Sequence, residues 1–192
     1  MTEAPFKTKI LILGPIQSGK TTIANYLADA TEMTGGDYRP TQGVRIVEFE
    51  SNDLELHGKS IDAEVELWDC SGDKKFEKCW PAIQKDTHGV ILVCNPESQE
   101  HSKELEQWYT AFVTRRGIRQ SHVIVFVHQK PESLGGSNNE ALADFRLPST
   151  MTGIQCVPSN IEEDGENLRL EFNNFLCSVI AGLTSHAGGT DR

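Results

Sequence analysis

The sequence lacks any apolar run near the roughly 20 residues that a membrane-spanning helix needs. Its first residues, MTEAPFK, contain neither the apolar stretch of a secretory signal nor a glycine at position 2 for myristoylation. Its last residues, AGGTDR, contain no cysteine for prenylation. We therefore expect neither a membrane span nor a lipid anchor.

Cysteine pairs and metal-binding histidine spacings are also missing. The chain has five cysteines, an odd number, and no CxxC pair. This pattern is typical of reduced thiols in a cytosolic protein and does not favour a disulfide framework or a zinc site. The six histidines show no spacing such as HExxH, so we expect none of them to be a metal ligand.

Positive charge is scarce. Lysine and arginine together number 18 against 28 aspartates and glutamates, which gives a formal net charge of −10. Nucleic acids and anionic membranes repel such a chain, so we expect non-specific binding to neither. Any phosphate binding must therefore come from a local arrangement of donors.

The length of 192 residues leaves room for a single domain, which we place at residues 1–184 with a disordered tail at 185–192. Strand and helix patterns alternate, which predicts an α/β fold with a three-layer, doubly wound and mostly parallel sheet. A hairpin is expected at 57–59 and a long polar surface loop at 131–150. The expected strands are 7–13, 44–50, 63–68, 89–94, 122–127 and 154–157, and the expected helices are 20–30, 105–113 and 168–183.

Residues 14–21, GPIQSGKT, match the phosphate-binding pattern GxxxxGK[ST] between an apolar strand and a helix pattern. Inward-pointing backbone N–H groups and the positive end of the helix predict a turn that wraps a nucleoside triphosphate. Lys20 places an ammonium against the β- and γ-phosphates, and the Thr21 hydroxyl binds the Mg²⁺ that bridges them. The predicted cofactor-binding residues of this turn are Gly14, Gln17, Ser18, Gly19, Lys20, Thr21 and Thr22.

Four short segments downstream of this turn gain meaning from their order. They are YRPTQG at 38–43, DCSGD at 69–73, QKPE at 129–132 and SN at 159–160. In this order they resemble the first switch, the DxxG switch, the NKxD base-reading motif and the SAK-type loop of the Ras superfamily of small GTPases. The resemblance covers about residues 7 to 183.

The resemblance assigns roles to residues that pattern alone does not. It implies that Thr41 meets Mg²⁺ only in the triphosphate state and that Asp69 holds the ion through water. It also implies that the Gly72 N–H contacts the γ-phosphate. The metal-site residues are then Thr21, Thr41 and Asp69, and the base-side residues are Gln129, Lys130, Glu132, Ser159 and Asn160.

Within that superfamily, the segments TQGVRI, ELWDCSGDKKFEKCWPA, DTHGV and SNIEED resemble the Rab-like small GTPases of the intraflagellar transport B complex. This likeness implies GTP or GDP as the ligand and the coiled-coil subunits of that complex as partners. It also implies a location in the cytoplasm and in the cilium or flagellum with its basal region.

The sequence departs from the superfamily pattern where hydrolysis is controlled. Asp73 replaces the glutamine that orients the attacking water, and a carboxylate cannot donate a hydrogen bond to the phosphoryl oxygens. Ile16 crowds the space through which an arginine finger would reach the γ-phosphate. With Lys20 and Asp73 as the residues nearest the reaction, we expect slow hydrolysis and a long-lived triphosphate state.

The base-reading segment departs as well. Gln129 and Glu132 keep the amide and the carboxylate of the usual asparagine and aspartate, but each is one methylene longer. Since base discrimination depends on buried hydrogen-bond pairing, we expect guanine to be preferred less strictly, with ATP and ADP as competitors.

Two other functions fit parts of the pattern. A small-molecule P-loop kinase needs an arginine-bearing lid, and the insertion at 131–150 carries the lone Arg146. A structural interaction protein would keep the turn but bind its partner regardless of nucleotide.

Overall fold

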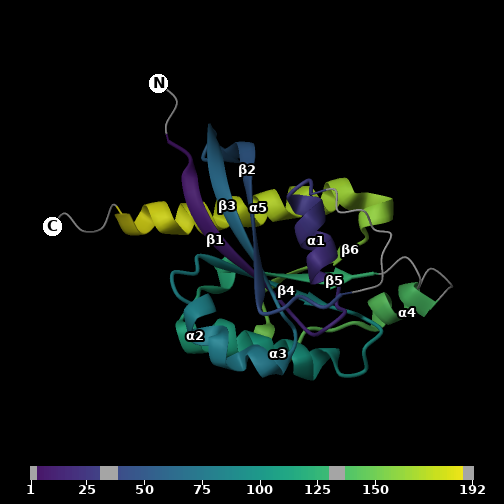
Figure 1. The fold of residues 1–192 in the computed structure, drawn as a ribbon. Helices are drawn as coiled ribbons and strands as arrows, with labels where there is room; N and C mark the ends of the chain where they lie inside the picture. The colour runs from purple at the N-terminus through teal and green to yellow at the C-terminus, as the bar shows by residue number, and fades with distance from the viewer. Residues whose placement is uncertain (1–3, 31–38, 130–136, 188–192) are drawn as a thin grey trace.

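The computed structural model describes residues 4–30, 39–129 and 137–187. Its centre is a six-stranded sheet with the order β2-β3-β1-β4-β5-β6 (Figure 1). Only the β2–β3 pair is antiparallel, so the predicted α/β fold with a mostly parallel sheet is confirmed. The strands are β1 (Phe6–Leu13), β2 (Val44–Leu56), β3 (Lys59–Cys70), β4 (Gly89–Cys94), β5 (Val123–His128) and β6 (Gln155–Ser159).

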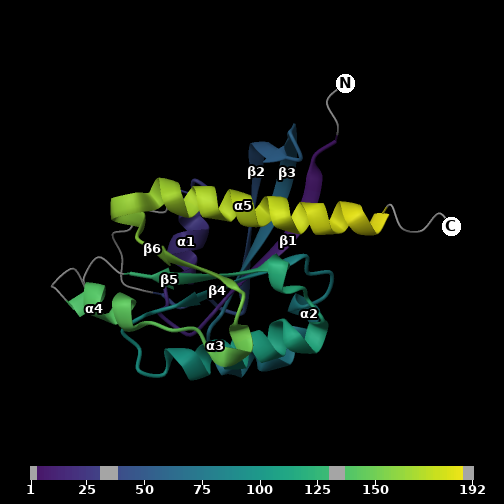
Figure 2. The same cartoon turned by 180° about the vertical axis from the view of Figure 1, so that it is seen from behind.

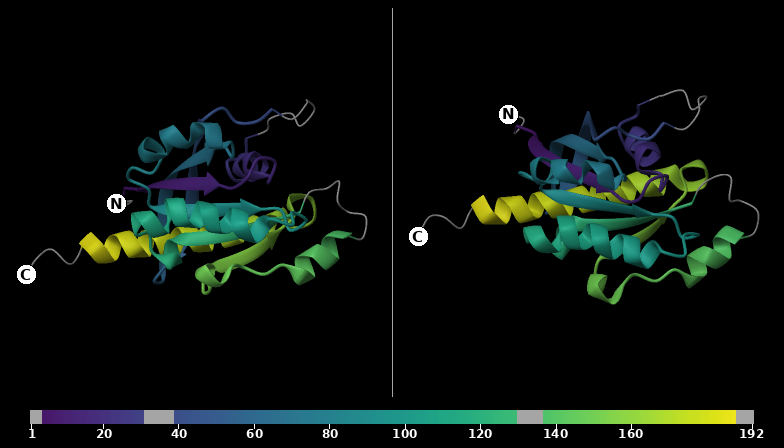
Figure 3. Two further views of the ribbon diagram at one scale, coloured as in Figure 1. Left: turned by 90° about the horizontal axis from the view of Figure 1, so that it is seen from below. Right: turned by 60° about the horizontal axis from the view of Figure 1, so that its bottom comes forward.

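Helices cover both faces of the sheet and complete the three layers. α1 and α5 lie on one side, and α2 and α3 lie on the other (Figures 2 and 3). The α-helices are α1 (Lys20–Leu27), α2 (Trp80–Ile83), α3 (His101–Phe112), α4 (Ser137–Asp144) and α5 (Ile161–Ala187). Short 3-10 helices are η1 (Lys74–Cys79), η2 (Thr114–Arg116), η3 (Gln120–His122) and η5 (Ser149–Met151).

The second half of β1 is buried on both of its faces. Ile10, Leu11, Ile12 and Leu13 are each 0% exposed. Ile10 and Ile12 belong to the apolar cluster that includes α1 and α5, whereas Leu11 and Leu13 belong to the cluster that includes α3. A strand between two helical layers is typically a continuous apolar run. Because this buried end of β1 leads directly into the turn at 14–19, it fixes the position of the turn.

The predicted hairpin is confirmed, but its strands are longer than the sequence pattern indicated. His57 and Gly58 form the two-residue connection with φ values of 53° and 74°, which suits a type I′ turn. A register shift between Ser51 and Leu54 interrupts the alternation of apolar and polar residues along β2. Because of that irregularity and the many charged positions, the sequence pattern did not predict the outer half of the hairpin.

The prediction of an irregular loop at 131–150 is wrong in its second half, where α4 and η5 lie. Phe145 and Met151 are buried in the α3-side cluster, and Leu142 packs against it. This apolar anchoring outweighs the glycine, asparagine and serine content on which the loop prediction rested. Residues 130–136 lie outside the described part of the chain.

α5 also extends further than predicted, from Ile161 to Ala187. The expectation of a disordered tail is therefore wrong for residues 185–187, while 188–192 lie outside the described residues. Near this end the Thr184 and Ser185 hydroxyls each donate to a helix carbonyl at 3.0 Å. These short polar side chains thus satisfy helix acceptors, a role that their composition did not reveal.

α1 ends earlier than predicted, at Leu27 instead of residue 30. Arg169 of α5 donates to the carbonyls of Tyr26 and Leu27 at 2.8 and 3.0 Å, and it forms an ion pair with Asp29 at 2.7 Å. A cation at the C-terminal end of a helix also complements its dipole. The helix that starts at the phosphate turn is therefore held at its far end by α5.

Candidate functional site

The turn between β1 and α1 has the backbone shape that phosphate wrapping needs. Gly14, Gln17 and Gly19 have φ values of 151°, 61° and 97°. A Cβ on Gly14 would lie 2.1 Å from the carbonyl oxygen of Val93, so no other residue fits there. The N–H groups at the start of α1 follow directly, and they have no partners within the helix itself.

Lys20 and Ser18 point into the same turn. Lys20 is 6% exposed, and its Nζ donates to the Pro15 carbonyl at 2.6 Å across the loop. Ser18 is 1% exposed, and its hydroxyl has no hydrogen-bond partner among the described residues. A buried ammonium and a buried orphan hydroxyl are both suited to phosphoryl oxygens.

The three predicted metal-site residues meet, although they come from α1, the segment before β2, and β3. The Thr21 hydroxyl donates to Asp69 Oδ2 at 2.6 Å. Thr41 Oγ1 lies 3.2 Å from Thr21 Oγ1 and 3.4 Å from Asp69 Oδ2. These oxygens match the ligand type that Mg²⁺ prefers, with phosphates and water completing its shell.

Asp69 has room for a further interaction. Its side chain is fully buried, and among the described residues its Oδ1 has no hydrogen-bond partner. Burial raises the pKa of this carboxyl, while the Thr21 hydroxyl and the Lys20 and Arg45 charges work in the opposite direction. A buried carboxylate oxygen without a protein partner fits a metal-bound water.

Arg45 belongs to this site and was missed by sequence reasoning. Its Nε lies 3.8 Å from Asp69 Oδ2, and its guanidinium also donates to Asn25 of α1. Arg45 pairs with Asp69 across the β2–β3 hairpin. Only the register of that pairing places the two together, so the sequence offered no local signal.

The DxxG segment packs directly on the phosphate turn. A Cβ on Gly72 would lie 2.5 Å from the Ile16 nitrogen and from the Pro15 carbonyl carbon, so glycine is needed for this contact. The Ser71 N–H donates to the Gly43 carbonyl at 2.8 Å, which ties this segment to the one that carries Thr41. The two switch-like segments thus meet at the turn.

The Asp73 side chain caps the 3-10 helix that follows it, η1. Its carboxylate accepts from the Lys75 N–H at 2.9 Å and forms an ion pair with Lys75 Nζ at 3.0 Å, so it caps η1. These interactions lower the pKa of Asp73. Ile16, the other residue predicted to impede hydrolysis, is 48% exposed.

The base-side residues are only partly described. Lys130 and Glu132 lie outside the described residues. The Gln129 N–H donates to the Ser159 carbonyl at 2.9 Å, which joins the ends of β5 and β6. Asn160 accepts from the N–H groups of Glu162 and Glu163 at 3.2 and 3.3 Å, so its side chain caps the start of α5.

Thr22, predicted at the end of the phosphate turn, lies in the first turn of α1 and its side chain is exposed.

Besides Arg45, the sequence analysis did not identify His128 as part of this region. His128 is 3% exposed at the end of β5, where it contacts both the turn and β6.

Arg146 does not behave as a kinase-lid arginine. It donates to the carbonyls of Ala143 and Phe145, each at 2.7 Å, and so caps the end of α4. This use of the guanidinium counts against the kinase alternative.

The described part of the chain contains no helix with the length and apolarity to cross a bilayer.

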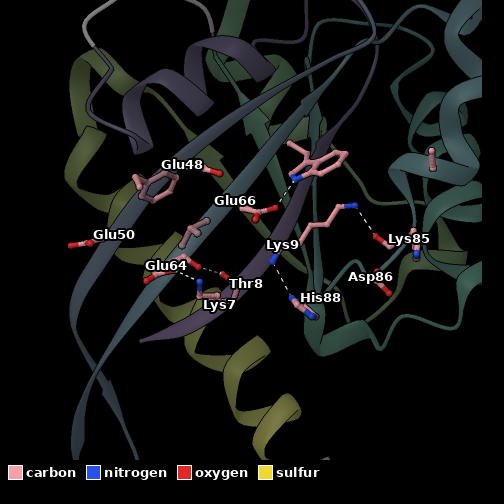
Figure 4. Close-up of a pocket in the computed structure, with 14 residues that line it drawn as sticks. Lys7, Thr8, Lys9, Glu48, Glu50, Glu64, Glu66, Lys85, Asp86 and His88 are labelled. Carbon is pink, nitrogen blue, oxygen red and sulfur yellow. Dashed lines mark hydrogen bonds and ion pairs between the residues drawn. The ribbon is translucent and has the colours of Figure 1, made fainter. Parts of the chain in front are cut away.

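A separate hollow of about 800 Å³ lies over β1, β2 and β3 and beside the segment before β4 (Figure 4). Lys9 Nζ lies in it 3.6 Å from the centre of the Trp68 ring and donates to the Lys85 carbonyl at 2.7 Å. None of the predicted nucleotide residues lines it. Its carboxylates would repel phosphates: Glu48, Glu50, Glu64, Glu66 and Asp86.

Comparisons with known proteins agree with this geometry. Residues 9–132 match the family described as "Ras of Complex, Roc, domain of DAPkinase". The "Intraflagellar transport protein 22 homolog" of Danio rerio is 46% identical over 93% of this chain and 93% of that protein. The Homo sapiens protein of the same name is 42% identical over 93% of this chain and 92% of its own length.

Solved structures give the same answer. The "T. brucei IFT22 GTP-bound crystal structure" is 30% identical, covers 93% of this chain and 99% of that one, and has a TM-score of 0.67. The "T. brucei IFT22/74/81 GTP-bound crystal structure" is 30% identical, covers 92% of this chain and 98% of that one, and has a TM-score of 0.63. The chain therefore belongs to the Ras-like small GTPases and, within them, to the intraflagellar transport protein 22 family.

Proposed function

We propose that this protein binds GTP and GDP with Mg²⁺ and acts as a nucleotide-dependent binding subunit of the intraflagellar transport B complex. The convergence of Thr21, Thr41 and Asp69 beside the phosphate turn carries the proposal. It brings the side-chain oxygens of these residues together, although Thr41 and Asp69 follow Thr21 by 20 and 48 positions in the sequence. The T. brucei relative has been crystallised with GTP and with GDP, which supports guanine nucleotides as the ligands.

Each residue has a defined task in this proposal. The backbone amides of the turn and the Lys20 ammonium hold the phosphates, and the buried Ser18 hydroxyl adds a donor. Thr21 and Thr41 would supply hydroxyl ligands to the metal ion, and Asp69 would hold it through a bound water. Mg²⁺ supplies neutralisation of the phosphate charge when it is bound.

Hydrolysis is slow in this proposal because Asp73, at the position of the water-orienting glutamine, is held by Lys75. Asp73 accepts two hydrogen-bonding interactions from Lys75 and has no hydrogen to donate when ionised. The protein then dwells in the triphosphate state, which suits a binding module better than a fast switch.

The expected base preference is guanine, with adenine nucleotides as weaker competitors. The side chains of Lys130 and Glu132 would decide this preference. Competition of ATP against labelled GTP measures it directly, and equal affinity would show that the base is not read.

The proposed partners are coiled-coil subunits of the intraflagellar transport B complex. The relative in the "T. brucei IFT22/74/81" crystal structure was solved with IFT74 and IFT81, and this chain matches nearly its full length. We infer the same kind of assembly here, located in the cytoplasm and in the cilium or flagellum.

Partner binding measured with GTP, with GDP and with Lys20→Ala tests the proposal. We expect the GTP-loaded protein to bind at least about tenfold more tightly than either of the others, since in this proposal Thr41 and Gly72 respond to the γ-phosphate. Equal binding in all three states would favour a structural subunit whose pocket does not control assembly. Failure of the wild-type protein to take up GTP or GDP with Mg²⁺ would refute nucleotide binding itself.

A further inference from the structure

The end of β5 carries a histidine that the proposed nucleotide chemistry does not use. His128 is 3% exposed and lies between the phosphate turn on one side and β6 on the other. We propose that His128 is a positioning residue, which fixes the phosphate turn relative to the base-side segments and thereby slows nucleotide release. This inference rests on the proposed nucleotide binding.

One edge of the imidazole lies against the turn. A Cβ on Gly19 would be 2.2 Å from His128 Cδ2 and 2.9 Å from Nε2, so the ring fills the space that a side chain at position 19 would need. Gly19 is the N-cap of α1, and its carbonyl accepts from the Ile23 N–H at 3.0 Å. The ring therefore supports the backbone immediately before Lys20.

The opposite edge of the ring is held by β6. Nδ1 of His128 lies 3.1 Å from Ser159 Oγ, a hydrogen-bond distance, and Ser159 is 2% exposed. His128 and Ser159 are also paired in the parallel β5–β6 register. Gln129 and Asn160, the residues that directly follow the two strands, begin the segments predicted to lie beside the base.

The physical consequence concerns geometry between two halves of one site. A nucleotide contacts the turn with its phosphates and the β5 and β6 ends with its base, so both halves must be correctly spaced at once. A rigid bridge between them lowers the cost of ordering the site when the ligand binds. Without the bridge, either half can shift and release its part of the nucleotide.

Three substitutions separate the two contacts of the ring. His128→Asn keeps a polar atom at the δ position for Ser159 and a second δ atom facing Gly19. His128→Leu keeps two δ carbons against Gly19 but cannot hydrogen-bond to Ser159. His128→Ala removes both contacts.

The measured quantity is the dissociation rate of fluorescently labelled GDP in excess Mg²⁺. We expect His128→Ala to accelerate release by at least about tenfold and His128→Leu by roughly three- to tenfold, because a buried hydrogen bond and its geometry are lost. His128→Asn should stay within about twofold of the wild-type rate.

His122 provides a matched control. It is also a buried histidine, it directly precedes β5, and a Cβ on Gly182 would lie 2.2 Å from its Nε2. It lies roughly 20 Å from His128 along the strand direction, at about 3.3 Å per residue. His122→Ala should lower thermal stability yet change nucleotide release by no more than about twofold.

The inference is overturned if His128→Ala or His128→Leu lowers stability but leaves the release rate unchanged, since His128 would then be ordinary core. It is equally overturned if His128→Asn releases nucleotide as fast as the alanine variant. If His128→Ala does not fold, the comparison of the leucine and asparagine variants still decides. Absence of nucleotide uptake by the wild-type protein would instead sink the proposed function.

Discussion

At the scale of single residues, the proposed site combines buried charged side chains, Lys20 and Asp69, with the half-buried hydroxyls of Thr21 and Thr41. Asp69 is fully buried, so its charge depends on the Thr21 hydroxyl and on the nearby Lys20 and Arg45 cations. Asp73 lies at the other extreme, on a partly exposed turn where Lys75 holds it. The same side-chain type therefore belongs to the proposed metal site in one place and caps a helix four residues later.

The first prediction is that the short side chain of Asp73 limits the rate of GTP hydrolysis. Asp73→Gln introduces an amide that can both accept from water and donate to a phosphoryl oxygen, and it is one methylene longer. We expect the single-turnover rate of GTP hydrolysis to rise by at least about tenfold, since a well-placed donor in such sites is typically worth that much or more. The measurement uses protein in excess over GTP at saturating Mg²⁺.

Asp73→Asn is the control for this prediction, because it removes the negative charge without extending the side chain. Its hydrolysis rate should stay within about threefold of the wild-type rate. An asparagine variant as fast as the glutamine variant would show that charge, and not reach, limits the reaction.

Some of these residues can be predicted from the sequence and others cannot, for a physical reason. Lys20, Thr21 and Ser18 lie in one contiguous motif, so their neighbours identify them, and the order of segments pointed to Thr41 and Asp69. Arg45 and His128 act through strand register and through a contact with a distant glycine, Gly19. Such relations exist only after folding, so no local pattern reports them.

At the scale of elements, two apolar clusters on opposite faces of the sheet hold the site in place. The strands were predictable where burial on both faces made them almost entirely apolar, as in the second half of β1 and in β4 and β5. The outer part of the β2–β3 hairpin and the helix α4 were not, because their polar composition concealed them. A few apolar anchors such as Leu142 and Phe145 fix α4, and their partners lie far away in sequence.

The second prediction tests the anchoring of α5. Phe172 is 1% exposed and its ring centroid lies 5.9 Å from that of Phe49 on β2. Phe172→Ala should lower the free energy of unfolding by about 3–5 kcal/mol, because it leaves a cavity in the cluster. Chemical denaturation of the protein at fixed nucleotide concentration measures the change.

Leu170 offers the matched control on the same helix, since it is 56% exposed. Leu170→Ala should change the free energy of unfolding by no more than about 0.5 kcal/mol. Equal losses for the two variants would show that α5 is not held through this buried face.

At the scale of the whole molecule, the bound nucleotide is expected to act as a clamp on segments that converge from many elements. Several segments meet at the carboxyl ends of the parallel strands. They are the turn after β1, the segment that carries Thr41, the DxxG segment, and the ends of β5 and β6. The Ser71 to Gly43 hydrogen bond and the Gly72 contact with the turn already couple the first three. A ligand that bridges them should therefore stabilise the fold as a unit.

The last prediction follows from this convergence. With Mg²⁺ and GTP at 100 times the measured dissociation constant, the protein should gain about 2.7 kcal/mol of stability by mass action. For a chain of this size, that corresponds to a rise in Tm of roughly 5–10 °C. GDP tested at the same concentration should give a smaller rise, because in the proposed function Thr41 and Gly72 contact the γ-phosphate. Thr41→Val keeps the side-chain shape but removes the hydroxyl, so its GTP and GDP curves should nearly coincide. If Thr41→Val keeps the wild-type difference between the two nucleotides, the proximity of Thr41 to Thr21 and Asp69 has no part in sensing the triphosphate.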